Sequence, residues 1–293
     1  MPELPEVETT IKGLKKEVLN RTFVNIWTDA PKLIKRPALE EFKKNIIGRK
    51  ITGIKRRAKN ILFCLDKNFV LLIHQKMSGH LLVGNWEEKN GKWVSKKRGP
   101  LLEDKMNKYL HVMFFLSGGK QMALSDLRKF AKIELWNKEA LGASKEYKAI
   151  GIEPLSPGFT LNKFKDLFKG KKGRIKQVLM DQNFIAGIGN IYASEILLEA
   201  RVHPETDARK LSPEDLKNIY SSIKKVLKRA IDLGGTSRSD YRNVYGEEGG
   251  FQKIAKVYGK EGSKCPLSCG GTVKRLKIGG RSSFYCPNCQ RKK

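Results

Sequence analysis

The chain opens with Met1-Pro2-Glu3-Leu4-Pro5-Glu6, and the interpretation of the whole sequence starts from this stretch. Removal of Met1 would expose the secondary amine of Pro2, and an α-amino group titrates near ~7.7 to 8.0, so a useful share is nucleophilic at neutral pH. A secondary amine condenses with an aldehydic carbon to an iminium ion, which is an electron sink. Glu3 could deliver or accept the proton that this reaction requires, and Glu6 follows one helical turn later on the same face. The same residues also suit an ordinary helix start, with acidic groups at the positive end of the dipole.

Periodic apolar residues predict a helix directly after this stretch, running to about residue 20. They recur at spacings of four, three and four, which is the pattern of one helix face, at Val7, Ile11, Leu14 and Val18. Packing of this face would attach the reactive end to the protein core.

Short alternating runs predict strands over residues 23–136. A hairpin is expected from residues 109–116 and 121–125, around Ser117-Gly118-Gly119. These runs favour a β-sandwich or a flattened barrel. The Lys-rich residues 84–108 break the strand pattern, so a surface loop or insertion is expected there.

The second half of the chain has helical periodicity. Residues 151–157 hold two prolines and a glycine and are typical of a domain linker. A long helix is expected from Ser212 as N-cap, with Pro213 in its first turn and Gly234 at its end. The preceding stretch 184–190 contains Gly187 and Gly189, and Asn190 is expected to cap the next helix.

Two segments in this half are candidates for nucleic-acid contact. The exposed N–H groups of the helix that Asn190 begins would suit a phosphate, although a plain helical hairpin fits the same residues. Residues 234–251 are polar, glycine-rich and too long for a simple connection, so they are functional or disordered. Their Arg238, Tyr241 and Arg242 suit a lid over an everted base or a clamp on the backbone.

Four of the five cysteines lie near the end of the chain, at Cys265, Cys269, Cys286 and Cys289. This is the ligand set of a structural zinc ribbon with one Zn²⁺. Strand-like runs on either side of Gly279-Gly280 predict a hairpin with Arg281 at its tip, where it could bind a phosphate. Two disulfides or unligated thiols are the alternative.

The charge balance indicates a polyanionic partner. There are 59 Lys and Arg residues against 30 Asp and Glu residues, a formal net charge of +29. Nucleic acid relieves the self-repulsion of such a surface. No apolar run approaches the ~20 residues that span a bilayer, so we expect a protein that contacts no membrane. We further expect it to be cytoplasmic, nucleoid-associated and a monomer.

Together these residues resemble the formamidopyrimidine-DNA glycosylase family over essentially the whole chain. The motifs that carry the resemblance are residues 2–6, Arg56-Arg57-Ala58-Lys59, Met77-Ser78-Gly79, Asp126-Leu127-Arg128-Lys129-Phe130, residues 179–182, residues 187–195 and residues 281–290. Family members are bifunctional base-excision enzymes with a helix-two-turn-helix domain and a C-terminal zinc finger.

The resemblance implies catalytic roles for five residues. Pro2 would form the Schiff base with C1′ of the damaged nucleoside. Glu3 would donate the proton that opens the sugar, and Glu6 would organise the pocket. Lys59 would serve β-elimination, and Arg281 would bind phosphate and serve δ-elimination.

The resemblance also implies DNA contacts. Met77, Arg128 and Phe130 match the residues that fill the gap left by an everted base. Further DNA contacts are implied or expected at Tyr109, Lys171, Lys176, Asn190 and Tyr241. The sequence departs from the family pattern at several positions. Three residues separate the first cysteine pair where the family usually has two, and Ala58 and Ala131 stand where glycine is usual. Asn60 stands where tyrosine is common, Gln75-Lys76 replaces a Leu-Gly pair, and Tyr109 stands where relatives often have histidine.

The sequence therefore predicts an α+β protein. The expected domains are an N-terminal helix with a β-sandwich over residues 1–150, a helix-two-turn-helix domain with the recognition loop over 151–252, and a zinc finger over 253–293. The expected activity is a DNA glycosylase and abasic-site lyase for oxidised purines in damaged double-stranded DNA, by β,δ-elimination. The alternatives are an endonuclease VIII-like enzyme for oxidised pyrimidines and a non-catalytic zinc-ribbon DNA-binding protein. His74 and His111 are expected to be strand histidines without a metal role.

Overall fold

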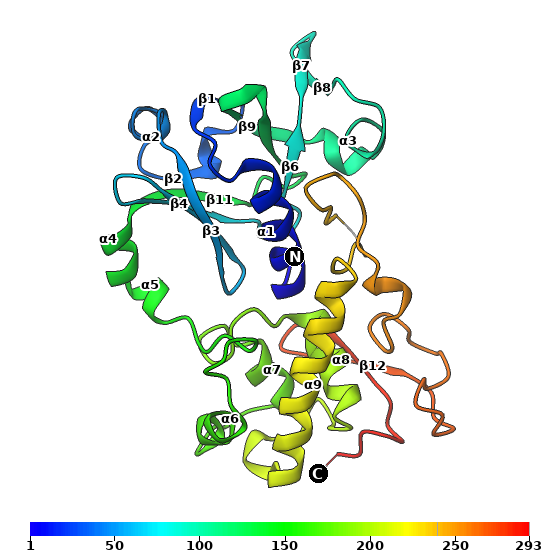
Figure 1. Cartoon of the computed structure of the whole chain (residues 1–293). Coiled ribbons are helices and arrows are strands. Elements are labelled where there is room, and N and C mark those ends of the chain that lie inside the picture. The colour runs from blue at the N-terminus through cyan, green and yellow to red at the C-terminus, as the bar shows by residue number, and fades with distance from the viewer. Residues whose placement is uncertain (239, 293) are drawn as a thin grey trace. The chain divides into compact units, whose positions relative to one another are not determined.

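The computed structural model describes residues 1–238 and 240–292. The chain forms two compact units (Figure 1). Unit 1 comprises residues 1–148 and 233–252, and unit 2 comprises residues 149–232 with the segment from 253 onward. The mixed helix and strand composition confirms the α+β prediction. The domain boundaries at about 150 and 252 stay a prediction, and the contacts group residues 233–252 with unit 1.

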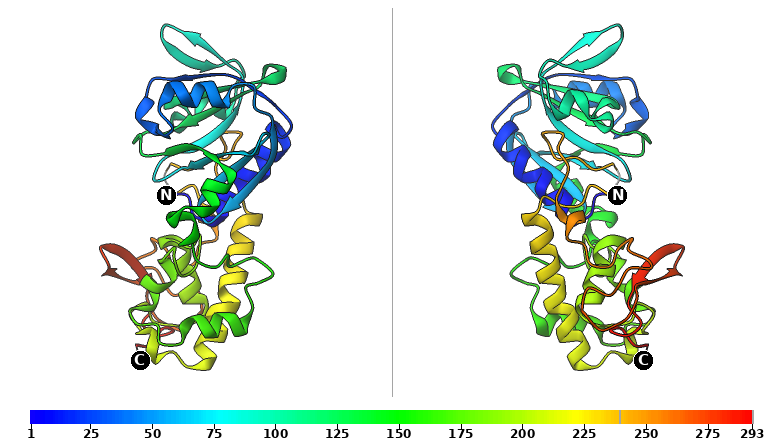
Figure 2. Two further views of the ribbon diagram at one scale, coloured as in Figure 1. Left: turned by 90° about the vertical axis from the view of Figure 1, so that its left-hand side faces the viewer. Right: turned by 90° about the vertical axis from the view of Figure 1, so that its right-hand side faces the viewer.

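Two sheets and the helices α1 (Leu4–Val18) and α2 (Leu39–Ile46) contribute to the core of unit 1 (Figures 1 and 2). The four-stranded antiparallel sheet has the order β1 (Phe23–Thr28), β9 (Leu110–Leu116), β10 (Gln121–Ser125), β6 (His80–Gly84). The five-stranded sheet has the order β2 (Ile34–Arg36), β11 (Lys132–Asn137), β5 (Phe69–His74), β4 (Asn60–Leu65), β3 (Ile51–Arg57). The predicted β-sandwich is thus confirmed, including the β9–β10 hairpin.

Helix α1 (Leu4–Val18) packs its apolar face into this core. The predicted residues Val7, Ile11, Leu14 and Val18 are each at most 2% exposed. Full burial of such a side chain stabilises the fold by roughly 1.5–3 kcal/mol. The N-terminus is therefore attached rigidly to the sheets. The remaining helices of unit 1 are α2 (Leu39–Ile46), α3 (Pro100–Glu103), α4 (Lys138–Ala143) and α5 (Lys145–Lys148).

Residues 84–108 were expected to be a surface loop or an insertion, and the loop alternative was wrong. They form a hairpin of β7 (Trp86–Lys89) and β8 (Lys92–Ser95), then α3 and a 3-10 turn η2 (Lys105–Lys108). The reason is aromatic packing that the many lysines conceal in the sequence: the Trp93 ring contacts Trp27 and Phe115 edge to face, with centroids 5.5 and 5.7 Å apart. We call residues 84–108 the insert segment.

Unit 2 is a helical bundle followed by a hairpin. Its helices are α6 (Leu161–Phe168), α7 (Ile175–Met180), α8 (Asn190–Glu199) and α9 (Pro213–Asp232), and its strands are β12 (Lys274–Ile278) and β13 (Arg281–Tyr285). The remaining short turns are η1 (Pro31–Leu33), η3 (Ser117–Gly119), η4 (Ala208–Lys210) and η5 (Phe251–Lys253). The predicted start of α9 is confirmed, because the Asp215 amide donates to Ser212 Oγ at 3.1 Å.

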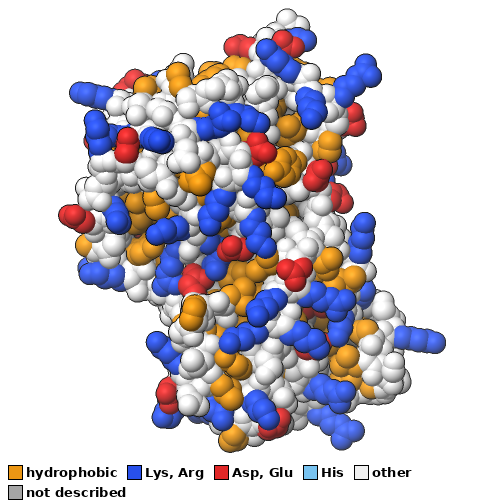
Figure 3. Space-filling model, viewed as in Figure 1, with side chains coloured by type: hydrophobic (Ala, Val, Ile, Leu, Met, Phe, Trp, Pro, Cys, Tyr) orange, Lys and Arg blue, Asp and Glu red, His pale blue; other side chains and the backbone are white. Residues whose placement is uncertain are grey.

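Lysine and arginine side chains are spread over the face of the molecule drawn in Figure 3, as the net charge of +29 requires. Within residues 1–238 and 240–292, no helix combines the length and apolar character that crossing a membrane would demand.

Candidate active site

The start of α1 forms a buried pair of carboxylates next to Pro2. Glu3 is the N-cap residue, and its side chain accepts the amide N–H of Glu6, while Glu6 Oε2 accepts the Glu3 N–H at 2.7 Å. Glu3 and Glu6 are 3% and 2% exposed, and Pro2 is buried. The positive end of the helix dipole and the two N–H donors offset the cost of burying both carboxylates.

Four charged groups surround the amino terminus. Burial lowers the pKa of the Met1 amine below its ordinary value, Glu3, Glu6 and Asp240 oppose this shift, and Lys59 adds to it. An amine with a lowered pKa is more often neutral and nucleophilic at pH 7. The terminus thus lies where an amine can both react and exchange protons.

Lys59 lies near the amino terminus and belongs to the tight turn between β3 and β4, where Arg57 pairs with Asn60. It is 5% exposed. The preceding Ala58 has a φ of +53°, in the left-handed region that favours glycine. The Arg56 guanidinium donates to the Ala58 carbonyl at 3.1 Å and to Glu8 of α1 at 2.8 Å, so Arg56 connects the turn to helix α1.

Described residues of the 234–251 loop cover the start of α1. The Thr236 amide donates to Glu6 Oε1 at 2.7 Å, and the Tyr241 hydroxyl donates to the Glu6 carbonyl at 3.1 Å. Tyr241 is 5% exposed, and burial raises its pKa, so the hydroxyl stays protonated. Tyr241, one of the predicted DNA contacts, therefore points into the protein, toward α1. Ser239 lies outside the described residues.

An exposed cluster on unit 1 gathers the predicted gap-filling residues. Met77 is 40% exposed and Phe130 is 50% exposed, and the Arg128 guanidinium lies 4.5 Å from the centroid of the Phe130 ring. Large apolar side chains in such exposure suit insertion between bases. Tyr109 is 37% exposed, and its carbonyl accepts the Asp126 amide at 2.9 Å.

Asp126 organises this cluster, a role that the sequence reasoning missed. It is 0% exposed. Its Oδ2 accepts the amides of Phe130 and Ala131 at 2.7 and 2.8 Å, and its Oδ1 accepts the Ser78 hydroxyl at 2.6 Å. One carboxylate thus joins the turn of Arg128 to the turn of Met77. The available signal in the sequence was an aspartate that opens the motif Asp126-Leu127-Arg128-Lys129-Phe130.

In unit 2, Asn190 is the first residue of α8, and Gly189 is the N-cap, so the predicted cap was wrong by one residue. Gly189 has the extended backbone of a cap and leaves the Asn190 side chain free to turn elsewhere. Its Nδ2 donates to the Ser282 carbonyl at 3.0 Å and to the Tyr258 hydroxyl at 3.2 Å. Asn190 therefore connects α8 with the terminal hairpin.

The two predicted lysine contacts differ in exposure. Lys176 is 1% exposed, and its Nζ donates to Ser194 Oγ at 2.8 Å and to the Ser282 carbonyl at 3.4 Å. Lys171 is partly exposed, with Nζ 4.4 Å from the Phe184 ring centroid and 3.5 Å from Asp181. Lys176 supports the hairpin from within, while Lys171 can reach a ligand.

Glu195 is a second organising acid that the sequence reasoning missed. It is 3% exposed, and its carboxylate accepts the amides of Lys256, Val257 and Tyr258 at 2.8 to 2.9 Å. It therefore fixes the segment that leads from α9 to the hairpin.

The four cysteines fit a structural zinc ion. Their sulfur atoms all lie within 4.8 Å of one another, with Cys265 and Cys289 3.6 Å apart and Cys269 and Cys286 3.5 Å apart. Tetrahedral Zn²⁺ with Zn–S bonds near ~2.3 Å requires sulfur separations of this order. The zinc prediction is confirmed. The hairpin turns at Gly279-Gly280, whose φ angles are +55° and +76°, and exposed Arg281 follows directly after this turn.

Three family models match the chain in order. They are the Formamidopyrimidine-DNA glycosylase N-terminal domain over residues 1–133, the Formamidopyrimidine-DNA glycosylase H2TH domain over 150–242, and a zinc finger found in FPG and IleRS over 262–291. Together with the buried site at Pro2, they define a DNA glycosylase of base excision repair.

Similar proteins extend the match over the full length. The chain is 37% identical to the formamidopyrimidine-DNA glycosylase of Pelotomaculum thermopropionicum over 100% of both chains, and 37% identical to that of Chloroflexus aurantiacus over 99% of this chain and 98% of the relative. Its structure is similar to the Lactococcus lactis Fpg in complex with DNA containing an abasic site, with a TM-score of 0.86, 31% identity, and coverage of 99% of this chain and 100% of that one. A complex of the Lactococcus lactis protein with Fapy-dG DNA gives a TM-score of 0.85 at the same identity and coverage. The chain belongs to the formamidopyrimidine-DNA glycosylase family.

Proposed function

We propose that the chain removes oxidised purines, such as 8-oxoguanine and formamidopyrimidines, from double-stranded DNA and then cuts the strand at the abasic site. The name of its relatives and the Fapy-dG in the similar complexes support this substrate class. The observation that carries the proposal is the pair of buried carboxylates, Glu3 and Glu6, beside Pro2.

The Pro2 amine, after removal of Met1, is the proposed nucleophile. Its lone pair forms the bond to C1′ while the glycosidic bond breaks, and the base leaves with the electron pair of the glycosidic bond and takes up a proton. Loss of the N–H proton then allows the C1′–O4′ bond to break, which gives the iminium, and Glu3 protonates O4′. Glu6 keeps the Glu3 backbone in place through its 2.7 Å hydrogen bond.

Strand cleavage follows from the iminium, which makes the C2′ protons acidic. Lys59 is the proposed base for β-elimination, in which the C2′–H bond breaks and the 3′ phosphate leaves. Its burial in the β3–β4 turn suits a lysine that exchanges protons. Arg281 is proposed to bind the phosphate that leaves in the δ step.

Extrusion of the damaged base costs a few kcal/mol, on the order of what unstacking requires. We propose that Met77, Arg128 and Phe130 offset this cost by filling the gap in the duplex, with Arg128 facing the orphaned base. Their exposure and the Arg128–Phe130 stacking support this role. Tyr109 is proposed as a neighbouring DNA contact.

Asn190, Lys171 and Arg281 are proposed to bind DNA phosphates. For Lys176 and Tyr241, the buried hydrogen bonds support positioning of neighbouring groups better than direct contact with DNA. The proposed functional domains remain residues 1–150, 151–252 and 253–293. We further propose a monomer that works on chromosomal DNA in the cytoplasm.

Borohydride trapping on a duplex with one 8-oxoguanine opposite cytosine tests this function. We expect a covalent adduct that maps to Pro2 by mass spectrometry, and a weaker adduct with Pro2→Gly, which keeps a primary amine. An adduct with an oxidised pyrimidine but none with 8-oxoguanine would assign the substrate of the endonuclease VIII-like alternative. Failure to trap either lesion or an abasic site, with Met1 removed, would leave a DNA-binding protein without this chemistry.

A further inference from the structure

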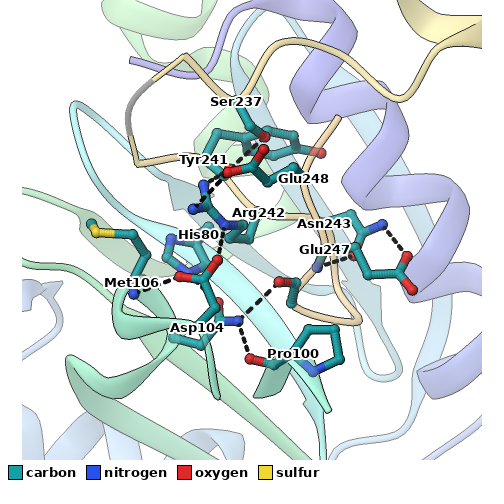
Figure 4. Close-up of polar contacts among 12 residues, drawn as sticks. His80, Pro100, Asp104, Met106, Ser237, Tyr241, Arg242, Asn243, Glu247 and Glu248 are labelled. Atoms are coloured by element: carbon teal, nitrogen blue, oxygen red, sulfur yellow. Dashed lines mark hydrogen bonds and ion pairs between the residues drawn. The ribbon is translucent and has the colours of Figure 1, made fainter. Parts of the chain in front are cut away.

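Arg242 is a buried cation held by two carboxylates (Figure 4). Its side chain is 7% exposed, Nε donates to Asp104 of the insert segment at 2.6 Å, and Nη2 lies 3.1 Å from Glu248. The third nitrogen, Nη1, donates to the carbonyl of Tyr241 at 2.8 Å. One guanidinium thus fixes the backbone at Tyr241 to the insert segment, with its charge compensated on both sides.

A second buried contact fixes the same loop to the same segment. Asn107 is 1% exposed, and its Nδ2 donates to the carbonyls of Pro100 and Gly246 at 2.8 and 2.9 Å. Its Oδ1 lies 3.0 Å from Nε2 of buried His80. Gly246 has a φ of +82°, and a Cβ there would lie 2.5 Å from Asn107 Nδ2, so the approach requires glycine.

The opposite side of the 234–251 loop lies on α1. Besides the bonds from Thr236 and Tyr241 to Glu6, Val244 packs so closely on α1 that a Cβ at Gly13 would lie 2.3 Å from its methyl group. Any shift of the loop would therefore move the donors that hold Glu6. Contacts run continuously from Asp104 through Arg242 and Tyr241 to Glu6.

Burial raises the pKa of Asp104, but the hydrogen bonds from Arg242 and the Met106 amide outweigh it, so the pKa lies below its ordinary value. The carboxylate is therefore ionised at neutral pH and available to Arg242. Asp104 and Asn107 both lie at the turn η2: Asp104 is its N-cap and accepts the Met106 amide at 2.8 Å, and Asn107 lies within it.

We propose that Arg242 is a positioning residue for the reaction, and that the insert segment is the anchor through which it acts. Asp104 and Asn107 hold the loop on α1, and the loop holds Glu6 beside the Pro2 amine. This inference rests on the proposed function. It assigns Arg242 no contact with substrate, so its loss should slow chemistry while leaving DNA affinity in place.

Single-turnover excision of 8-oxoguanine by the full chain tests the proposal. We expect Arg242→Leu to lower the rate at least tenfold, Arg242→Lys to recover part of it, and Asp104→Ala to lower it several-fold. The double variant Arg242→Leu/Asp104→Ala should be no slower than Arg242→Leu, because Asp104 acts through Arg242. Glu87→Gln, which removes the exposed 2.7 Å pair with Lys89 on the same insert segment, is the matched control and should keep the full rate.

Two further measurements separate positioning from loss of fold. Affinity for DNA with a stable abasic analogue should stay within about threefold, and amide hydrogen exchange should accelerate in peptides from 234–251 but not in those from β10. A full rate in Arg242→Leu with a loosened loop would overturn the proposal, as would equal losses of rate, affinity and protection everywhere. Absence of excision by the unaltered protein would instead refute the proposed function.

Discussion

The backbone amide of Thr236 donates a 2.7 Å hydrogen bond to Oε1 of Glu6. The other oxygen of the same carboxylate accepts the Glu3 amide at the start of the helix. A single buried side chain thus joins two chain segments that are 230 residues apart. The geometry of the reactive terminus depends on the loop as well as on the helix.

Glu6→Gln should therefore damage both stability and catalysis. Glutamine keeps one acceptor oxygen but turns an NH₂ group toward a backbone N–H, and an unsatisfied buried donor costs about 1–3 kcal/mol. We expect that loss in denaturant unfolding and a fall of at least tenfold in single-turnover excision. The exposed Glu41→Gln in α2 serves as the control. Wild-type stability in Glu6→Gln would contradict the two buried hydrogen bonds that this carboxylate accepts.

Asp126→Asn should loosen the exposed cluster of Met77, Arg128 and Phe130. The carboxylate accepts amides on Oδ2 and a hydroxyl on Oδ1, and an asparagine amide can accept on only one of these sides. We expect about 1–3 kcal/mol less stability and several-fold weaker binding to DNA that contains an abasic analogue, measured by fluorescence anisotropy. The exposed Asp232→Asn should change neither quantity. Unchanged DNA affinity in Asp126→Asn would mean that the cluster keeps its shape without this residue.

Much of the site was predictable because its signals are local. The capping arrangement of Glu3 and Glu6 follows from their spacing of three, the zinc site from paired cysteines, and the β9–β10 hairpin from alternation around glycines. What the sequence could not show are contacts between distant segments. The bond from Thr236 to Glu6 has no local pattern, and Lys176 and Tyr241 resemble surface residues until their buried partners are seen.

The prediction of a loop for the insert segment was wrong for a different reason. The lysines of this segment are exposed, whereas Trp86 of β7 and Trp93 of β8 pack in one apolar cluster with residues of the four-stranded sheet, and this packing supports the hairpin. Composition alone therefore suggested a loop. Asn190 was misplaced by one residue because helix ends are specified by backbone geometry at Gly189, which residue type predicts poorly.

Ala58→Gly should stabilise the protein. Ala58 has a φ of +53°, where a Cβ costs roughly 1 kcal/mol that glycine avoids. We expect an increase of about that size in the free energy of unfolding. The same substitution at exposed Ala140, inside helix α4, should instead destabilise by about 0.5–1 kcal/mol. If both variants lost stability equally, strain at Ala58 would be refuted.

Acid should destabilise the fold before the carboxylates titrate. Burial lowers the pKa of His80 below 6.5, and burial with nearby Lys76, Lys59 and Lys132 lowers the pKa of His74 to about 3. Below pH 6.5 the histidine is protonated in the unfolded chain but stays neutral in the folded protein. Stability therefore falls as the pH drops from 6.5 toward the folded pKa, by up to about 1.4 kcal/mol per pH unit for each histidine.

Denaturant unfolding at pH 7.0, 6.0 and 5.0 measures this slope. His74→Asn should make the dependence on pH shallower by about one proton, because asparagine does not titrate. An identical slope in the variant and the unaltered protein would show that His74 keeps an ordinary pKa.

Removal of zinc should weaken DNA binding at least tenfold while unit 1 stays folded. The terminal segment buries few apolar side chains, among them Val273, Ile278 and Phe284, so the metal supplies much of its stability. We expect one zinc per chain by atomic absorption, none in Cys286→Ser, and at least a tenfold loss of affinity for abasic-analogue DNA in that variant. Cys64→Ser, in β4, should retain both the metal and the affinity.

Because the Ser282 carbonyl in the hairpin accepts from Asn190, collapse of the hairpin also removes the partner that orients the Asn190 side chain. Full DNA affinity in zinc-free protein would refute a structural role of the metal in binding.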